Sequence, residues 1–259
     1  MLVYSAIDSA TIKRIDNILI ENNVKANNLI SFIDTASIKK IDIIKQFSKN
    51  LLIDSGAFTI FNNPSKIKNY NDYVKKYIDF IKKNDDDVVK GYFEFDVGKF
   101  IDYEDVKNIR NDLLEVSDKI IPVWHNYLGV EEFKNMCNEY DYIGIGGIAS
   151  KEIKVEQTIP LMKYGIKNDV KLHMLGMTRQ EVLNKYPFYS CDTTRWISGR
   201  FGKIWLYKNN KVYSKKLNSK YCSENRIKID YLCYMNFKKF QDYYYNKWKE
   251  YDKEHYESQ

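Results

Sequence analysis

Short apolar runs alternate with helical segments along the first 192 residues of this chain. Each run holds four to seven mainly apolar residues, which is typical of a strand buried on both faces of a parallel sheet. No Pro-, Gly- or Ser-rich linker separates them. Eight runs occur, over residues 2–7, 28–33, 51–54, 91–97, 119–125, 142–147, 171–176 and 189–192.

Amphipathic segments lie between these runs. The first carries Ile12, Ile15 and Leu19, whose spacing marks one face of a helix. Eight strand–helix units in a chain of 259 residues predict an α/β fold, a closed (β/α)₈ TIM barrel. An open doubly wound sheet is the alternative, but it usually has fewer strands. Further helices are predicted over residues 38–47, 73–81, 106–116, 130–140, 159–164 and 180–186.

The C-terminal part is basic and aromatic. Residues 203–208 are compatible with another strand, and residues 229–251 predict one or two helices packed outside the barrel. From Arg195 to Glu250 the sequence has 14 Lys or Arg and 4 Asp or Glu, a balance of +10. Such a surface suits nucleic acid, although a solvated lysine face has the same composition. We predict a catalytic barrel over residues 1–208 and a basic, aromatic-rich helical extension over residues 209–259.

Cysteine spacing and hydropathy bear on the compartment. The four cysteines form no CxxC pair, so a structural zinc is not expected. The apolar N-terminal run is too short for a signal peptide and lacks a basic segment before it. No apolar run approaches the roughly 20 residues that span a bilayer. We expect a soluble, cytoplasmic protein with no membrane partner.

Polar residues collect where the predicted strands end. Because a (β/α)₈ barrel builds its active site at the carboxyl ends of its strands, we expect these residues to face one mouth. They are Asp54, Ser55 and Phe58 after the third run, Asp96 in the fourth, His125 in the fifth, Gly146, Gly147 and Ile148 at the sixth, His173 and Leu175 in the seventh, and Asp192 in the eighth.

Each of these residues also has a structural explanation. Asp54 and Asp96 could cap the helices that follow them, and a lone histidine such as His125 is commonly part of a core. His173 lies within its strand, where a structural role is as plausible as a catalytic one. Glycines are frequent wherever a strand turns into a loop. The functional interpretation depends on all of them meeting at one end of the barrel.

Paired carboxylates at one mouth suit the cleavage of a glycosidic bond. One acts as nucleophile and another moves a proton. The glycines would let a flat heterocycle approach the backbone, and Phe58 would provide a stacking surface. Arg195 and Arg200 follow Asp192 closely and would hold phosphates. The pattern predicts a nucleobase pocket that acts on a nucleic acid.

From about residue 51 to residue 205, the chain resembles the tRNA-guanine transglycosylase (queuine tRNA-ribosyltransferase) superfamily. Six segments follow the order typical of that superfamily. They are the DSGAF sequence at 54–58, the FD pair at 95–96, His125, the GGIASKE sequence at 146–152, the MLG sequence at 174–176, and residues 192–202, which begin with an aspartate and end in SGRFG.

The resemblance implies roles for single residues. Asp192 would be the nucleophile and Asp54 the general acid/base, while Asp96 would accept hydrogen bonds from the amino and imino edge of the base. The other edge would be read by His125, Gly146, Gly147 and Ile148. Ser55, Phe58 and Leu175 would complete the pocket. The implied chemistry needs no metal ion and no organic cofactor.

The sequence departs from the superfamily at several positions, and one departure bears on which nucleic acid the protein would modify. Ala57 and Thr59 stand where a glycine and a glutamine are usual, and His125 replaces a glutamine. The zinc motif that helps tRNA enzymes hold tRNA is absent from the sequence. This compact pattern is more similar to the phage-type branch, which exchanges guanine in DNA for a 7-deazaguanine such as preQ0; a phage enzyme would work in the host cytoplasm.

Three other functions are compatible with the sequence. The first is the same guanine exchange on tRNA. The second is a catalytically inactive barrel that binds nucleic acid or a partner protein, although the presence of both Asp54 and Asp192 argues against it. The third is a nucleosidase that releases a base by hydrolysis. The sequence does not indicate the oligomeric state.

Overall fold

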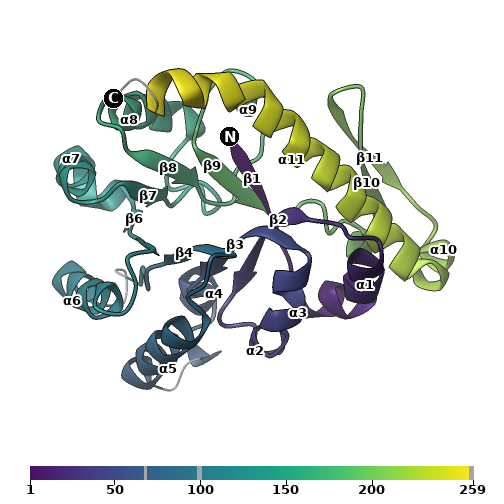
Figure 1. The fold of residues 1–259 in the computed structure, drawn as a ribbon, viewed down its shortest axis with the longest axis horizontal. Helices are drawn as coiled ribbons and strands as arrows, with labels where there is room; N and C mark the ends of the chain where they lie inside the picture. Colours follow the sequence, from purple (N-terminus) through teal and green to yellow (C-terminus); the bar gives the residue numbers. More distant parts are fainter. Residues whose placement is uncertain (67–68, 98–100, 257–259) are drawn as a thin grey trace.

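The computed structural model describes residues 1–66, 69–97 and 101–256. It forms a (β/α)₈ barrel whose parallel strands lie at the centre with helices around them (Figure 1). The strand order is β5-β4-β3-β2-β1-β9-β8-β7-β6. The strands are β1 (Leu2–Ala6), β2 (Ala26–Ser31), β3 (Ser48–Asp54), β4 (Val89–Phe93), β5 (Ile120–Ile121), β6 (Val123–Trp124), β7 (Tyr142–Ile145), β8 (Lys171–Met174) and β9 (Ser190–Thr193).

The expected strand over residues 119–125 is divided in two at Pro122. Its first part, β5, pairs with β4, and its second part, β6, pairs with β7. The two ends of the strand order are therefore parts of one segment, and the sheet closes there. Because proline has no N–H to donate, the ladder is interrupted at this position. The N–H of Val123, the residue after Pro122, donates a hydrogen bond to the Glu94 carboxylate at 2.5 Å.

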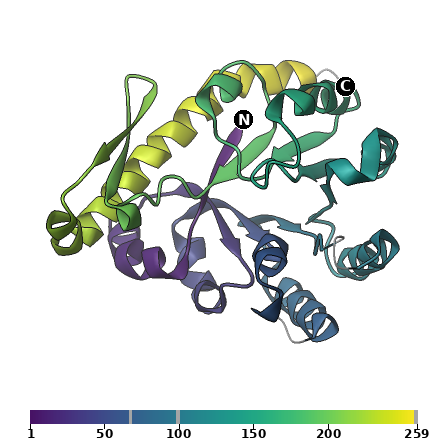
Figure 2. The ribbon, with the colours of Figure 1, turned by 180° about the vertical axis from the view of Figure 1, so that it is seen from behind.

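Helices surround the strands, as Figure 2 shows from the opposite side. The helix expected over residues 38–47 begins only at Ile41, and a separate short helix before it ends at Ile38. The helices are α1 (Ser9–Glu21), α2 (Thr35–Ile38), α3 (Ile41–Gln46), α4 (Ala57–Asn62), α5 (Tyr70–Asn84), α6 (Tyr103–Leu114), α7 (Gly129–Glu139), α8 (Val155–Lys167) and α9 (Gln180–Leu183), with single 3₁₀ turns η1 (Pro64–Lys66), η2 (Asn126–Leu128) and η3 (Gly199–Phe201).

Two apolar layers hold the barrel together. Alternate strand residues point inward, because successive side chains of a strand face opposite sides of the sheet. The outward residues pack under the helices in one large cluster that includes Val3, Ile30 and Leu51. The inner cluster consists of Tyr4, Ala6, Leu29, Leu52, Phe93, Ile121 and Val123, with Leu2, Tyr142 and Leu175 packed against it.

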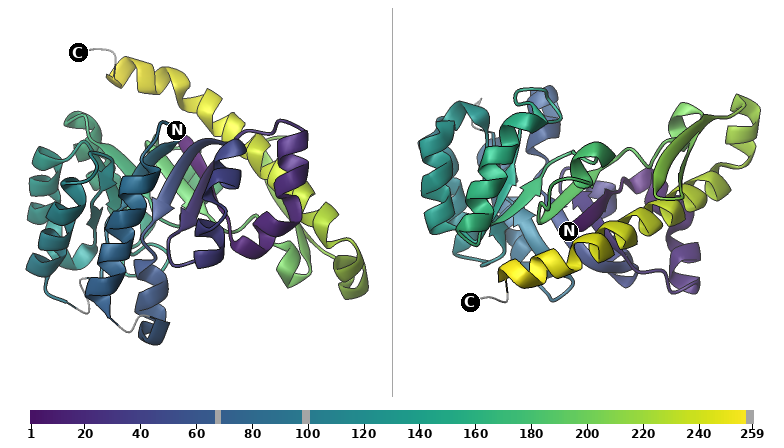
Figure 3. Two further views of the ribbon diagram at one scale, coloured as in Figure 1. Left: turned by 60° about the horizontal axis from the view of Figure 1, so that its bottom comes forward. Right: turned by 90° about the horizontal axis from the view of Figure 1, so that it is seen from above.

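The C-terminal helix α11 (Arg226–Tyr256) packs against the outside of the barrel. It runs obliquely across the outside of the barrel, as two further views show (Figure 3). The Tyr234 hydroxyl donates to Asn28 of β2 at 2.9 Å, and the Gln241 amide donates to the Ser5 hydroxyl of β1 at 3.0 Å. The helix therefore covers β1 and β2 on the outside of the barrel.

A β-hairpin precedes this helix and crosses residue 208, where the sequence placed the domain boundary. It joins β10 (Lys203–Lys208) to β11 (Lys211–Lys216), and α10 (Ser219–Glu224) follows. Asn209 and Asn210 form the two-residue turn with φ angles of 51° and 57°, which asparagine tolerates well. The expected extension thus contains a strand as well as helices. Its residues 257–259 lie outside the described part of the chain.

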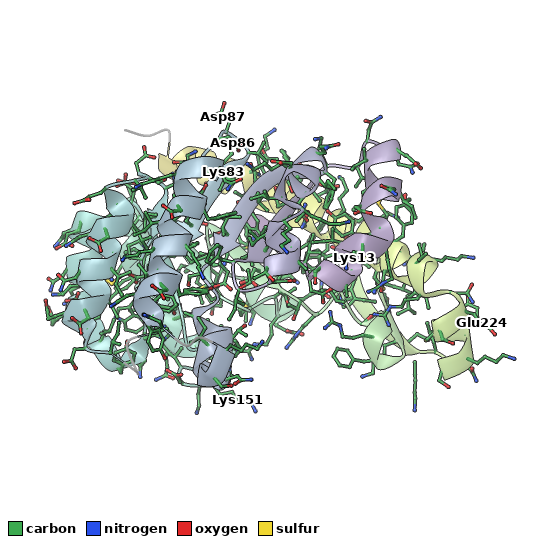
Figure 4. All side chains as sticks on the ribbon, turned by 90° about the horizontal axis from the view of Figure 1, so that it is seen from below. Lys13, Lys83, Asp86, Asp87, Lys151 and Glu224 are labelled. Carbon is green, nitrogen blue, oxygen red and sulfur yellow. The ribbon has the colours of Figure 1, made fainter. Side chains whose placement is uncertain are left out.

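The two ends of the barrel differ in the loops they carry. Asp86 and Asp87 precede β4 and lie at one end, whereas Lys151 follows β7 and lies at the other (Figure 4). The strands therefore run from the Asp87 end to the Lys151 end, which is the mouth. Within the described ranges, no helix combines the length and apolarity that a bilayer crossing demands.

Candidate active site

A cavity of about 1020 Å³ opens at the carboxyl ends of the strands. It brings together most of the residues that the sequence singled out, from six different strand ends or the loops after them. Ser31, Asp34 and Glu152 add polar atoms that the sequence argument did not use. The predicted site residues in its lining are Asp54, Phe58, Asp96, His125, Gly146, Gly147, Leu175, Asp192, Arg195 and Arg200.

Asp192 is held by two donors on the same oxygen. The Gly176 N–H donates to Oδ1 at 2.7 Å, and Nε2 of His173 lies 3.2 Å from the same atom. Only 8% of Asp192 is exposed, yet it lines the cavity. Hydrogen bonds of this kind stabilise the ionised carboxylate, and they leave Oδ2 to face other groups.

His173 connects Asp192 to the barrel interior. Its side chain is fully buried, and Nδ1 lies 2.8 Å from the Ser190 hydroxyl, which lies 2.6 Å from the Tyr142 hydroxyl. A carboxylate can only accept, so Nε2 must donate to Asp192. In the neutral ring Nδ1 then accepts from Ser190, and Ser190 accepts from Tyr142. His173 therefore touches the predicted nucleophile and lies behind it.

Asp54 also accepts two hydrogen bonds, from the Ser31 hydroxyl and from the Gly56 backbone. The Ser31 hydroxyl donates to its Oδ2 at 2.8 Å. Burial, together with the smaller effects of the charges of Asp96 and Asp192, raises the pKa of Asp54 to about 6 against the lowering effects of the hydrogen bonds from Ser31 and from the Gly56 backbone. A carboxyl with such a pKa can give or take a proton near neutral pH.

Asp96 forms a pair with His125. Nε2 of His125 lies 2.8 Å from Oδ2 of Asp96. Burial lowers the pKa of His125, but the hydrogen bond to Asp96 and the charge of Asp96 outweigh it, so the net pKa is raised. The ring stacks on Tyr127, with centroids 5.7 Å apart. A protonated His125 would present a cationic donor at the cavity wall.

Gly146 makes room for this histidine. A Cβ on Gly146 would lie 2.4 Å from Cε1 of the His125 ring, so any side chain would displace it. Gly147 has a φ of +83°, a conformation that residues with a side chain rarely adopt. The glycine pair is thus explained by two local requirements, and the first serves the His125–Asp96 pair.

The sequence argument missed a buried ion pair below Asp96. Arg110 of α6 binds the Glu94 carboxylate through Nε at 2.7 Å and through Nη2 at 3.1 Å, and both side chains are 1% exposed. Glu94 also accepts the Val123 N–H, so the pair joins β4, β6 and α6. The available signal was an arginine on the apolar face of the helix that also carries Val106 and Leu113.

Only some of the residues predicted to contact a base line the cavity. Phe58 is 56% exposed on α4 and lines the cavity, as does Leu175. Ser55 lies outside the lining: it is fully buried, and its hydroxyl donates to the Glu94 carbonyl at 2.7 Å. The Ile148 side chain also lies outside the lining and packs against the outer core. Any contact of Ile148 with a base would therefore use its backbone.

The two arginines differ in their partners. Arg200 is paired with Asp8, the residue that caps α1. Arg195 is exposed at the cavity rim, and within the described residues its guanidinium has no hydrogen-bond or ion-pair partner. Arg195 is therefore available to bind an anion at this rim. Across the described ranges, no cluster of three or more His, Cys, Asp or Glu side chains is arranged to hold a metal ion.

No family model matches this sequence, and no curated protein matches it. The functional assignment therefore depends on the residues of the cavity and on their geometry.

Proposed function

We propose that this protein is a transglycosylase that exchanges guanine in DNA for a 7-deazaguanine base such as preQ0. The observation that carries the proposal is the contrast between two carboxylates of one cavity. Asp192 accepts two hydrogen bonds on one oxygen, whereas the pKa of Asp54 is raised to about 6. One is suited to attack and the other to proton transfer. The resemblance to guanine transglycosylases supports the same roles.

In the first step Oδ2 of Asp192 attacks C1′ of the target nucleotide. The C1′–N9 bond breaks, its electron pair passes to N9, and Asp54 in its protonated form donates a proton to the departing guanine. The product is a glycosyl ester on Asp192. Splitting one displacement into two in this way lowers each barrier.

In the second step the deazaguanine enters the cavity. Its ring N–H proton passes to Asp54, the ring nitrogen attacks C1′, and the ester bond breaks with its electron pair returning to Asp192. Asp54 thus recovers the proton that it gave away. The free Oδ1 of Asp96 would accept from the amino and imino edge of the base, and Phe58 would stack on its face.

The target base must leave the helix to reach such a cavity, because an enzyme cannot act on a base that is stacked within a duplex. The test is to incubate the protein and radiolabelled guanine with duplex DNA in one reaction and with bulk tRNA in another, and then to count the label in each polymer. Label in DNA is the expected result. Label in tRNA alone would move the chemistry to RNA, and label in neither polymer would contradict the proposal.

A further inference from the structure

The β10–β11 hairpin has one covered face and one open face. Trp205 and Tyr207 of β10 point toward α11, where Trp205 packs against Phe237 and Tyr207 against Phe240, with ring centroids 5.4 and 5.3 Å apart. Side chains alternate along a strand, and directly paired residues share a face. The opposite, open face holds Leu206 and Lys208 of β10 with their partners Tyr213 and Lys211 of β11, and Lys215, whose partner Ile204 is partly buried against the core.

The open face is basic and contains an exposed aromatic ring. Lys208, Lys211 and Lys215 are exposed, and Tyr213 between them is 48% exposed. Within the described residues, none of these three lysines has an ion-pair partner. Aromatic rings set among cations are a feature of nucleic-acid surfaces, where the cations bind phosphates and release counterions.

The charge of this region differs from that of an ordinary lysine-rich surface. Residues 193–223 contain eight Lys or Arg and no Asp or Glu. On α5, by contrast, Lys75, Lys82 and Lys83 alternate with acids such as Asp72 and Asp79. A face that served only solubility would carry both signs. The one-sided charge indicates an anionic partner.

The hairpin begins at the rim of the cavity. Arg200 and Phe201 line the cavity, and β10 starts two residues later. Glu224, at the end of α10, lies toward the same end of the barrel as Lys151, which is the mouth (Figure 4). A strand of six residues is about 20 Å long, which equals about six base-pair steps of B-DNA. The open face is thus placed to contact nucleic acid beside a nucleotide held in the cavity.

We propose that the open face of the hairpin binds the major groove of duplex DNA that flanks the nucleotide in the cavity. A two-stranded ribbon fits the major groove of B-DNA, whereas the major groove of A-form RNA is too deep and narrow for protein side chains to read. The lysines would contact phosphates on the two sides of the groove, and Tyr213 and Leu206 would face the base edges. This inference rests on the proposed function and selects duplex DNA as its polymer.

The test compares two triple variants with the same change in net charge. In the first, Lys208, Lys211 and Lys215 are replaced by Gln; in the second, Lys75, Lys82 and Lys83 on α5 are replaced by Gln. Binding to a fluorescein-labelled 30-base-pair duplex is measured by anisotropy between 50 and 200 mM NaCl. Bulk tRNA serves as an unlabelled competitor. Circular dichroism confirms that each variant is folded.

We expect the hairpin variant to bind the duplex on the order of a hundredfold more weakly at 0.1 M salt, with a salt slope smaller by about three. The α5 variant should bind like the unmodified protein. Equal loss in both variants, or no loss in the hairpin variant, would overturn the proposal. It would also be overturned if the hairpin variant lost its affinity for tRNA but kept its affinity for the duplex.

The guanine-exchange assay separates this inference from the proposed function. If the unmodified protein binds duplex DNA through the hairpin but exchanges no guanine, the docking surface is supported and the transglycosylase proposal fails. If the hairpin variant exchanges guanine in dilute duplex DNA as fast as the unmodified protein, the docking surface is wrong and the exchange activity stands.

Discussion

The two sides of the cavity treat their carboxylates differently. On the β8–β9 side, Asp192 is fixed by a backbone N–H and by a histidine that is itself held by a buried serine and tyrosine. On the β2–β3 side, Asp54 accepts from the Ser31 hydroxyl and from the Gly56 backbone, but burial outweighs both hydrogen bonds and raises its pKa to about 6. In the function that we propose, these surroundings, and not the residue type, would suit one carboxyl group to attack and the other to proton transfer.

The largest effect should follow from removing the charge on the fixed side. Asp192→Asn keeps the size of the side chain but removes the nucleophilic oxygen, so guanine exchange should fall on the order of 10⁴-fold. Affinity for DNA, measured by anisotropy, should change little. A variant that still exchanges guanine at the normal rate would show that the two sides have been assigned wrongly.

The histidine behind Asp192 should matter next. His173→Phe removes one of the two donors on Oδ1, and we expect kcat to fall on the order of 100-fold with KM nearly unchanged. His173→Gln places an amide N–H near the position of Nε2 and should recover part of the loss. If Phe and Gln variants are equally impaired, His173 acts through packing and not through its hydrogen bond to Asp192.

The raised pKa of Asp54 should make the free energy of unfolding depend on pH. Its pKa is raised from 3.8 to about 6, so the folded state binds the proton more tightly than the unfolded state, and stability falls as pH rises from about 4 to 6. Asp54→Asn should therefore raise the free energy of unfolding by about 3 kcal/mol at pH 8 and leave it nearly unchanged at pH 3, below both pKa values. Urea denaturation at the two pH values measures both. An equal effect at both would contradict the raised pKa.

The smallest effect concerns the His125–Asp96 pair. Gly146→Ala would bring a methyl group into the His125 ring and separate it from Asp96, so the pKa of His125 should fall toward its ordinary value. The chain has only three histidines, so an NMR titration can follow His125 directly. Gly129→Ala controls for general destabilisation, because its φ of +78° makes the substitution strained while nothing lies within 4 Å of the added Cβ. An unchanged His125 titration in Gly146→Ala would refute this role of the glycine.

The barrel could be predicted from the sequence because its signal is repeated. Eight apolar runs between helical segments admit few arrangements, and the (β/α)₈ prediction is confirmed. The break at Pro122 and the later start of the helix expected over residues 38–47 could not be located by apolar periodicity, because a turn or a side-chain hydrogen bond decides such points. The packing of α11 against the outside of the barrel depends on contacts such as that of Gln241 with Ser5, which lie more than 200 residues apart in the sequence.

The candidate site was predicted unevenly for the same reason. The barrel rule places Asp54, Asp96 and Asp192 at one mouth, since each follows or ends a strand. The partners that distinguish the carboxylates come from other strands: Ser31 for Asp54, and His173 for Asp192. The sequence left the role of His173 open, because only the structure shows which side of the strand faces the cavity. The base-contact and catalytic roles of these residues stay predictions.

The central claim is that Asp192 forms a covalent bond to the sugar, and a trapped adduct tests it most directly. The protein is incubated with a labelled guanine-containing DNA duplex without an incoming base, denatured at mildly acidic pH and analysed on a denaturing gel, with peptide mass spectrometry of the shifted band. We predict a labelled band that carries the DNA on the peptide containing Asp192 and that is absent in Asp192→Asn. A band that persists in Asp192→Asn, or an adduct on another residue, would contradict the account.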